Sequence, residues 1–280
     1  MNLNKFSLNG KVFPIKKANI SVLNIEYQYG FGVYETVRVN DSIPFFLPQH
    51  MNRLMGSAKI VGVAHPFSEK ELIRYTEKLI KKLKEKTYNL KFILIGGDQK
   101  EASLIYIFPS CPLFPNKKML KNGASVVITN FERIFPQAKT LNMLQSYIAY
   151  KKAKQNNCYD ALGIDRTGFI REGTRTNFFA IKGNIIYKAP KETILDGVTQ
   201  RVVLSVASKN GFEIREGNIR KEDLKNFDGF FLTSTGVKVI PISKIDDIIF
   251  SVPESTNKLV TLVNDFFNNC KGIFENENLN

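Results

Sequence analysis

The stretch FPQAKTLNMLQSYIAYKKAKQ, residues 135–155, places Lys139 just ahead of a helical pattern. The residues before it, TNFERIFPQA, read as the end of a strand and a turn. Helical spacing after it is carried by four apolar residues, Leu141, Leu144, Tyr147 and Ile148. The pattern predicts a helix over 141–156 with these residues on its apolar face. Lys139 is then either a plain loop lysine or, if burial lowers its pKa, an amine that can form a Schiff base.

Composition indicates an ordinary globular protein. The chain has 280 residues, 43% hydrophobic and 24% charged, enough for one large domain or two of ordinary size. It has no apolar run of 18 residues, and its start, MNLNKFSLNG, lacks the apolar core of a signal peptide. Three cysteines and two histidines are too few for a disulfide framework or a multi-histidine metal site. We therefore expect a cytoplasmic protein with no metal site and no membrane association.

A formal net charge of +14 raises the question of nucleic-acid binding. The densest basic run, Lys78–Lys86, has a simpler explanation. Ser68 and Glu71 form a capping box, and the following leucines and isoleucines fall on one helical face, which leaves the lysines on the solvated face. We expect no nucleic-acid partner, although a positive field can attract small anions.

The order of predicted elements indicates two α+β parts. Residues 1–111 form the first, the proline-containing segment 112–122 links them, and residues 123–280 form the second. The first part should contain a hairpin turning at Asn9-Gly10 and a helix over 50–61, in which His50 is a cap or packing residue. The second should contain turns at residues 166–168 and 182–184 and a helix ended by Gly211.

Several groups along the chain have complementary chemistry. Glu172, in IREGTRTNFF, is a lone carboxylate on a strand-like segment and needs a cationic partner. The start of the helix in LDGVTQR offers backbone N–H groups to a phosphate, and the hydroxyls of TSTG, residues 233–236, and the charge of Arg53 could join them. Taken singly, each has a plain alternative as a surface charge, a cap or a turn. In combination with the amine of Lys139 they would fit pyridoxal 5′-phosphate.

The sequence also resembles the class IV, or fold type IV, pyridoxal-phosphate aminotransferases, which include branched-chain and D-amino-acid aminotransferases and aminodeoxychorismate lyases. The matching segments follow one order over nearly the whole chain: YGFGVYETVRV, HMNRLMGSAKI, AKTLNML, EGTRTNFF, LDGVTQR and FLTSTGVKVIPI. The resemblance implies an α+β fold of two domains with the cofactor between them, usually a homodimer. By position, Lys139, at the start of the second domain, would hold the cofactor and Glu172 its ring nitrogen. Its phosphate would be bound by Arg53, the amides of Val198 and Thr199, and Ser234 with Thr235.

Three departures leave the subfamily open. Relatives commonly have arginine at Gln200. Branched-chain enzymes often have tyrosine where this chain has Leu144, and the arginine-x-histidine carboxylate trap of D-amino-acid enzymes is missing from ILIGGDQKEASL. The candidates for the substrate carboxylate are Arg175 first and Arg38 second, then Lys238, with Tyr34 as a further substrate-binding residue.

The leading interpretation is an aminotransferase acting on an amino acid, of the branched-chain or D-amino-acid type, and a 2-oxo acid. Aminodeoxychorismate lyase, which uses the same lysine to eliminate pyruvate, is the alternative within the family. A basic, non-catalytic binding protein that kept the fold is the alternative outside it.

Overall fold

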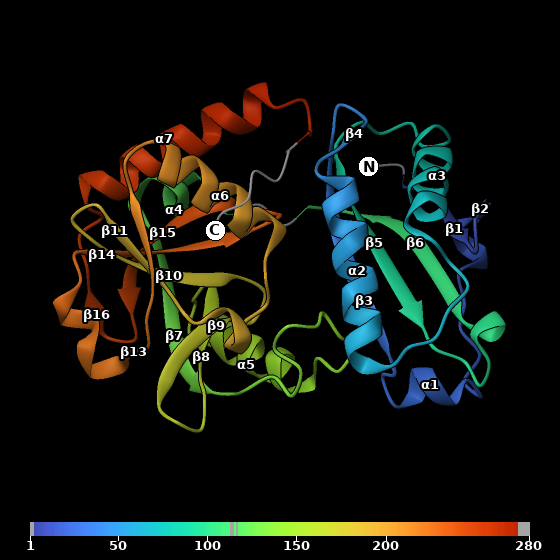
Figure 1. Cartoon of the computed structure of the whole chain (residues 1–280), viewed down its shortest axis with the longest axis horizontal. Coiled ribbons are helices and arrows are strands. Elements are labelled where there is room, and N and C mark those ends of the chain that lie inside the picture. The colour runs from blue at the N-terminus through green and yellow to red at the C-terminus, as the bar shows by residue number, and fades with distance from the viewer. Residues whose placement is uncertain (1–2, 113–114, 116, 274–280) are drawn as a thin grey trace. The chain divides into compact units, whose positions relative to one another are not determined.

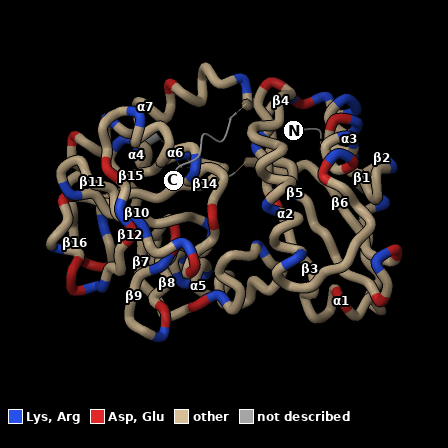
Figure 2. Tube along the Cα trace, viewed as in Figure 1, with Lys and Arg blue, Asp and Glu red and all other residues tan. Residues whose placement is uncertain are grey.

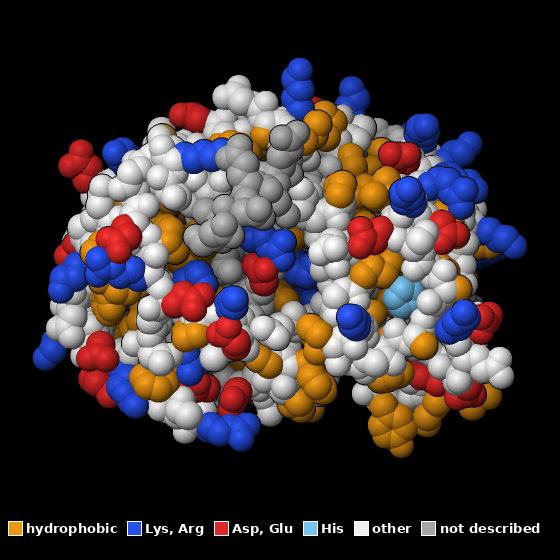
Figure 3. All heavy atoms as spheres, viewed as in Figure 1, with side chains coloured by type: hydrophobic (Ala, Val, Ile, Leu, Met, Phe, Trp, Pro, Cys, Tyr) orange, Lys and Arg blue, Asp and Glu red, His pale blue; other side chains and the backbone are white. Residues whose placement is uncertain are grey.

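The computed structural model describes residues 3–112, 115 and 117–273, and the chain divides into two compact units. Unit 1 comprises Met1–Leu113, Ala138–Asn142 and Lys271–Ile273, and unit 2 comprises the remainder. Each unit combines a sheet with helices (Figure 1), so the expected α+β class is confirmed. Lys and Arg residues occur throughout both units (Figure 2), and Asp and Glu side chains lie among them on the face in view in Figure 3. No helix within the described ranges is both long and apolar enough to cross a membrane.

Unit 1 contains an antiparallel six-stranded sheet in the order β2-β1-β6-β5-β3-β4. Its strands are β1 (Lys5–Leu8), β2 (Lys11–Pro14), β3 (Gly32–Asn40), β4 (Ile43–Pro44), β5 (Tyr88–Ile95) and β6 (Leu104–Ser110). Its helices are α1 (Ile25–Gln28), α2 (Leu47–Val61) and α3 (Glu69–Ile80), with 3-10 turns at Ile15–Lys17 and Lys100–Ala102. The predicted turn at Asn9-Gly10 joins β1 to β2, with φ of 47° and 79°, values that Asn and Gly tolerate.

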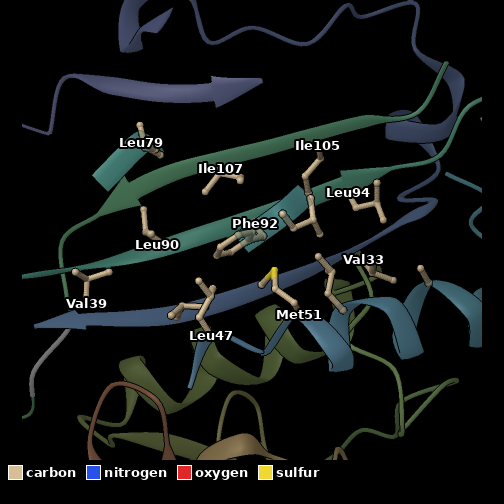
Figure 4. Packing of buried hydrophobic residues seen from close by; sticks show 14 of the residues in the cluster. Val33, Val39, Leu47, Met51, Leu79, Leu90, Phe92, Leu94, Ile105 and Ile107 are labelled. Atoms are coloured by element: carbon tan, nitrogen blue, oxygen red, sulfur yellow. The ribbon is translucent and has the colours of Figure 1, made fainter. Parts of the chain in front are cut away.

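The core of unit 1 lies between helix α2 and the sheet. Leu47 and Met51 of α2 face Val33, Phe92 and their neighbours on β3, β5 and β6 (Figure 4). The predicted capping box is present at the start of α3: the Ser68 hydroxyl accepts from the Glu71 amide and the Glu71 carboxylate accepts from the Ser68 amide. The predicted helix over 50–61 is confirmed, and it begins three residues earlier, at Leu47.

The segment Ala138–Asn142, which carries Lys139, belongs to unit 1. Its backbone lies along the edge of β3: the Tyr34 amide donates to the Lys139 carbonyl at 2.8 Å, and the Leu141 amide donates to the Gly32 carbonyl at 2.9 Å. The sequence placed Lys139 at the start of the second domain, because the residues on both sides of it lie there. Hydrogen bonds to a strand more than 100 residues earlier cannot be read from local patterns.

Unit 2 contains a ten-stranded mixed sheet, in which β7 pairs in parallel with β8 and β15. The strands are β7 (Ala124–Asn130), β8 (Asp160–Ile164), β9 (Phe169–Gly173), β10 (Asn177–Lys182), β11 (Ile185–Lys188), β12 (Glu213–Glu216), β13 (Ile219–Arg220), β14 (Gly229–Ser234), β15 (Lys238–Ile245) and β16 (Ile248–Ile249). The helices are α4 (Lys117–Asn122), α5 (Leu144–Gln155), α6 (Val198–Lys209) and α7 (Glu254–Asn269), with 3-10 segments at Lys191–Thr193 and Lys221–Asn226. The predicted turns before β9 and β11 are present.

One expectation for unit 2, the apolar face of the helix after Lys139, needs correction, and the linker stays a prediction. The predicted linker, residues 112–122, includes helix α4, and its residues 113, 114 and 116 lie outside the described part. Helix α5 begins at Leu144 rather than residue 141, and Leu144, Tyr147 and Ile148 are exposed at 68%, 58% and 58%. The small residues Ser146, Ala149 and Ala153 face the sheet instead, because the helix packs close to it. The sequence prediction placed the large apolar residues on the buried face and therefore missed the small residues that are buried.

Candidate active site

Lys139 is held at its backbone by β3 and α2. Its amide donates to the Ser57 hydroxyl at 3.0 Å, and its carbonyl accepts from the Tyr34 amide. Its Nζ then lies 4.4 Å from the centroid of the Tyr34 ring, within cation–π range. Position 32 in β3 requires glycine, because a Cβ there would lie 2.4 Å from the Leu94 carbonyl oxygen of the neighbouring strand. The lysine that the sequence singled out is therefore an amine fixed over an aromatic ring.

A buried charge cluster lies on the other face of β3. The Glu35 carboxylate, with no exposed surface, accepts from Arg53 through Nε at 2.5 Å and a terminal nitrogen at 3.0 Å, and its Oε2 lies 2.9 Å from His50 Nδ1. The side chains of His50 and Arg53 are 1% and 9% exposed. Arg53, predicted to bind phosphate, is thus oriented by Glu35.

Burial and charge act in opposite directions on this cluster. Burial would raise the pKa of Glu35, but Arg53 and His50 together hold that pKa far below its ordinary value. Burial lowers the pKa of His50, and the facing Glu35 carboxylate only partly offsets this effect. Sequence reasoning missed Glu35, although a signal existed: at a period of two, Glu35 falls on the same buried face as Val33, Val37 and Val39.

Glu172 lies on β9 and is 4% exposed. Its Oε1 is 3.2 Å from Arg133 Nε, and its Oε2 is 3.4 Å from both the Asn177 side-chain nitrogen and the Leu195 amide. Asn177 also donates to the Leu195 carbonyl at 2.8 Å. The predicted need for a cationic partner is therefore met by Arg133, a residue that the sequence did not single out.

A second buried carboxylate fixes the turn that follows Glu172. Asp160 is fully buried and accepts from the Thr174 amide and hydroxyl through Oδ1 and from the Thr176 hydroxyl through Oδ2, at 3.2, 2.5 and 2.9 Å. These bonds hold the turn between β9 and β10. They explain why this polar segment of the sequence is buried.

The start of helix α6 follows Leu195 by three residues. Its N-cap, Gly197, supplies no side-chain bond, so the amides of Val198 and Thr199 have no capping partner within the described part of the chain. A Cβ at Gly197 would lie 2.2 Å from Asn177 Oδ1, so only glycine fits between β10 and the helix. Gln200 is 4% exposed, and its side-chain oxygen lacks a hydrogen-bond partner among the described residues. Ser234 ends the neighbouring strand β14, and Thr235 follows in a turn.

A cavity of about 350 Å³ in unit 2 adjoins Glu172. It is lined by Phe131, Glu132, Arg133, Ile134, Pro136, Gly163, Asp165, Arg166, Arg171, Glu172, Glu192 and Thr193. Burial would raise the pKa of Asp165, but donors from Thr167, Phe169 and Arg171 lower it to about 2. The wall of the cavity therefore carries both signs of charge, and its Asp165 carboxylate remains ionised at neutral pH.

This pKa gives a pH-dependent expectation. The folded pKa of Asp165 is depressed, so its stabilising effect is present above its ordinary pKa of 3.8 and is lost as the pH falls toward 2. The variant Asp165→Asn should have a lower melting temperature than wild type at pH 6. The difference in melting temperature should narrow as the pH is lowered to 2. Asp247→Asn, at a fully exposed carboxylate, is the control. A gap that is constant with pH would show that ionisation of Asp165 does not matter.

The candidates for the substrate carboxylate lie in different surroundings. Arg38 is half-buried on the same face of β3 as Tyr34, and burial lowers its pKa. The Arg175 guanidinium lies over the rings of Tyr150 and Tyr159 at 4.6 and 5.1 Å and donates to the Tyr159 carbonyl. Lys238 donates to the Asn264 side chain and lies 5.0 Å from the Phe267 ring. Arg175 and Lys238 thus have aromatic packing partners that the sequence did not predict.

The family profile described as Amino-transferase class IV matches residues 32–245. The chain belongs to the class IV aminotransferases. It is 32% identical over 254 residues to a D-alanine aminotransferase of Bacillus licheniformis, covering 86% of this chain and 88% of that one. It is 29% identical over 271 residues to a putative branched-chain-amino-acid aminotransferase of Methanocaldococcus jannaschii, covering 91% and 93%.

Solved structures give the same fold. A branched-chain amino acid aminotransferase of Escherichia coli superposes with a TM-score of 0.86 over 98% of this chain and 97% of that one, at 24% identity. A putative 4-amino-4-deoxychorismate lyase of Legionella pneumophila superposes with a TM-score of 0.79 over 90% and 97%, at 26% identity. The chain therefore has the fold type IV architecture and is an enzyme of the pyridoxal-phosphate-dependent aminotransferase kind.

The residues of this class IV chain fit pyridoxal 5′-phosphate. The buried carboxylate of Glu172 has two neutral donors at 3.4 Å, long enough for Oε2 to accept a stronger bond from a ring N–H. Helix α6 offers the uncapped backbone amides of Val198 and Thr199 as hydrogen-bond donors. These donors suit a phosphate at a helix N-terminus.

Proposed function

We propose that this class IV enzyme transfers the amino group of an amino acid, of the branched-chain or D-amino-acid type, to a 2-oxo acid. The observation that carries the proposal lies within unit 2. The buried Glu172 carboxylate contacts Leu195, three residues before the uncapped start of α6, so a ring-nitrogen acceptor and phosphate donors adjoin one another. The purified enzyme should be yellow, and a screen of L- and D-amino acids against 2-oxoglutarate and pyruvate tests the proposal. A protein that stays colourless with added cofactor contradicts it.

Each residue has a role that follows from its chemistry. When bound, pyridoxal 5′-phosphate supplies an electron sink for the pair left when the substrate Cα loses its proton. The Lys139 amine would hold the cofactor and would take the Cα proton as general base. Glu172 holds the proton on the ring nitrogen. Arg53, the amides of Val198 and Thr199, and the hydroxyls of Ser234 and Thr235 bind the phosphate.

For the substrate carboxylate we rank Arg38 above Arg175. Arg38 shares the Tyr34 face of β3, and the Tyr34 ring lies under the Lys139 amine. Arg175 contacts two tyrosine rings, which gives it a packing role. An arginine fork suits a carboxylate better than the point charge of Lys238. Steady-state kinetics of the alanine variants at 38, 175 and 238 separate the three, because only the true partner raises KM for amino acids without weakening the cofactor.

Cofactor affinity tests the role of Arg53. Arg53→Ala should weaken binding of pyridoxal 5′-phosphate by about 1.5–3 kcal/mol, the usual range for a hydrogen bond to a charged group. Equilibrium dialysis with the apoprotein measures this. Thermal melting of the same apoprotein shows how much stability the variant loses because the buried Glu35 carboxylate no longer has Arg53 as a partner. Unchanged affinity in a folded variant would limit Arg53 to the charge cluster.

Aminodeoxychorismate lyase is the second candidate, favoured by the structural similarity to the Legionella pneumophila protein. Both reactions begin by removing the Cα proton with the same lysine. Release of pyruvate from aminodeoxychorismate without any 2-oxo acid would identify the lyase. Aminotransferase turnover without such release would exclude it.

We also propose that the enzyme is a cytoplasmic homodimer. Both units expose large apolar side chains, namely Val22, Leu23 and Tyr29 in unit 1 and Ile134 and Leu144 in unit 2, at 68–85% exposure. Such surfaces are typical of protein contacts. Light scattering after gel filtration should give twice the chain mass of 31.8 kDa. A mass of one chain, unaffected by concentration, would refute the dimer.

A further inference from the structure

We propose that Arg133 is a positioning residue for Glu172, which it keeps ionised and oriented so that the proton stays on the cofactor's ring nitrogen. This inference rests on the proposed role of Glu172. Arg133 itself need not touch the cofactor. It acts through the carboxylate, whose charge state decides whether that group accepts a hydrogen bond from the ring or donates one to it.

The two side chains form a nearly enclosed ion pair. The side chains alone of Arg133 and Glu172 are 13% and 6% exposed, and Arg133 Nε lies 3.2 Å from Glu172 Oε1. A terminal nitrogen of Arg133 also donates to the Thr174 carbonyl at 3.3 Å. Because Thr174 follows Glu172 by two residues, the guanidinium is anchored to the same turn as the carboxylate. Both members of the pair are therefore tied to the same segment, residues 172–174.

The two oxygens of Glu172 have different neighbours. Oε1 faces the cation, whereas Oε2 faces the neutral donors of Asn177 and Leu195, each at 3.4 Å. A buried carboxylate without a counter-charge tends to take up a proton, and an adjacent cation prevents this. Arg133 thus favours the anion, which leaves Oε2 as an acceptor on the side toward α6.

Other cations of the same cavity are engaged elsewhere. Arg171 donates to Asp165 and to the Asn218 side chain, and Arg166 pairs with Glu132 at 2.8 Å on the exposed rim. Among the described residues, Arg133 is the cation in direct contact with Glu172. Its loss would remove the cation that contacts the carboxylate, which favours the protonated form and a neutral ring nitrogen.

A four-way comparison tests this inference: wild type, Arg133→Met, Glu172→Gln and the double variant, with Arg166→Met as control. The readouts are the dissociation constant for pyridoxal 5′-phosphate and the pH midpoint of the bound cofactor's absorbance. Arg133→Met should weaken binding about tenfold and move the midpoint upward, since removing a cation raises the pKa of nearby groups. With glutamine at 172, the same change should have less than about a twofold effect. Arg133→Lys should recover part of the cofactor affinity and part of the shift in the pH midpoint, because lysine restores the charge but not the planar guanidinium.

Each outcome has one reading. If Arg133→Met changes the cofactor affinity and the pH midpoint equally with glutamate or glutamine at position 172, the inference is overturned. It is also overturned if Arg133→Met has no effect on either quantity with glutamate at 172. If Glu172→Gln itself leaves affinity and absorbance unchanged, the proposed role of Glu172 fails instead. Thermal melting of each apoprotein confirms that the variants compared are folded. An effect of Arg166→Met as large as that of Arg133→Met would point to general charge in the cavity and also overturn the inference.

Discussion

Replacing Lys139 with alanine should reduce amino transfer by about 10³-fold or more, because the variant loses both the covalent attachment of the cofactor and the general base. Its Nζ lies over the Tyr34 ring, while its backbone is bonded to β3 and to Ser57. Alanine keeps those backbone bonds, so the fold should be unaffected. Turnover and the absorbance of the bound cofactor are the measurements.

Lys151→Ala is the matched control for Lys139→Ala, since Lys151 is an exposed residue of α5 without a proposed role. It should retain full activity and colour. Turnover by Lys139→Ala that clearly exceeds the rate of free amine and cofactor without enzyme would show that another group performs the proton transfer.

The second large effect concerns stability. Glu35→Gln should lower the free energy of unfolding by about 3–5 kcal/mol, because it leaves the buried Arg53 without its counter-charge. Urea unfolding of the apoprotein measures this. Glu213→Gln removes an exposed pair with Arg215 and should cost less than about 1 kcal/mol. Equal effects of the two variants would mean that Glu35 contributes no more than a surface charge.

The pH dependence of Glu35→Gln has a definite sign. The folded pKa of Glu35 is lowered, so its contribution is complete above its ordinary value of 4.5 and declines as the pH falls below it. The difference in unfolding free energy between wild type and Glu35→Gln should therefore be largest near neutral pH and shrink in acid. A gap that widened on acidification would contradict the assignment of an ionised Glu35.

Local signals in the sequence were sufficient for much of the fold. The turn at Asn9-Gly10, the capping box at Ser68 and the glycine after α6 each specify backbone geometry through neighbouring residues, and each is present. The apolar face of α5 was mispredicted, because contact with the sheet selects small residues such as Ala149 rather than large ones. Packing distance is a tertiary property that periodicity does not carry.

For the candidate site, the sequence indicated which residues to consider, and their roles stay predictions. Motif order pointed to Lys139 and Glu172 as functional residues, and to the family that the comparison then showed. The partners that set their chemistry were not predictable, because Arg133 lies 39 residues before Glu172 and Glu35 lies 18 before Arg53. Such ion pairs depend on how strands and helices come together, and one sequence gives no direct signal of these pairings.

The central claim is that Lys139 is the residue that holds the cofactor. Borohydride reduction of the protein loaded with pyridoxal 5′-phosphate fixes the cofactor to its lysine, and proteolysis with mass spectrometry identifies the modified peptide. We predict a single phosphopyridoxyl group on the peptide that contains Lys139. Modification of a different lysine, or no modification of a yellow protein, would contradict the account.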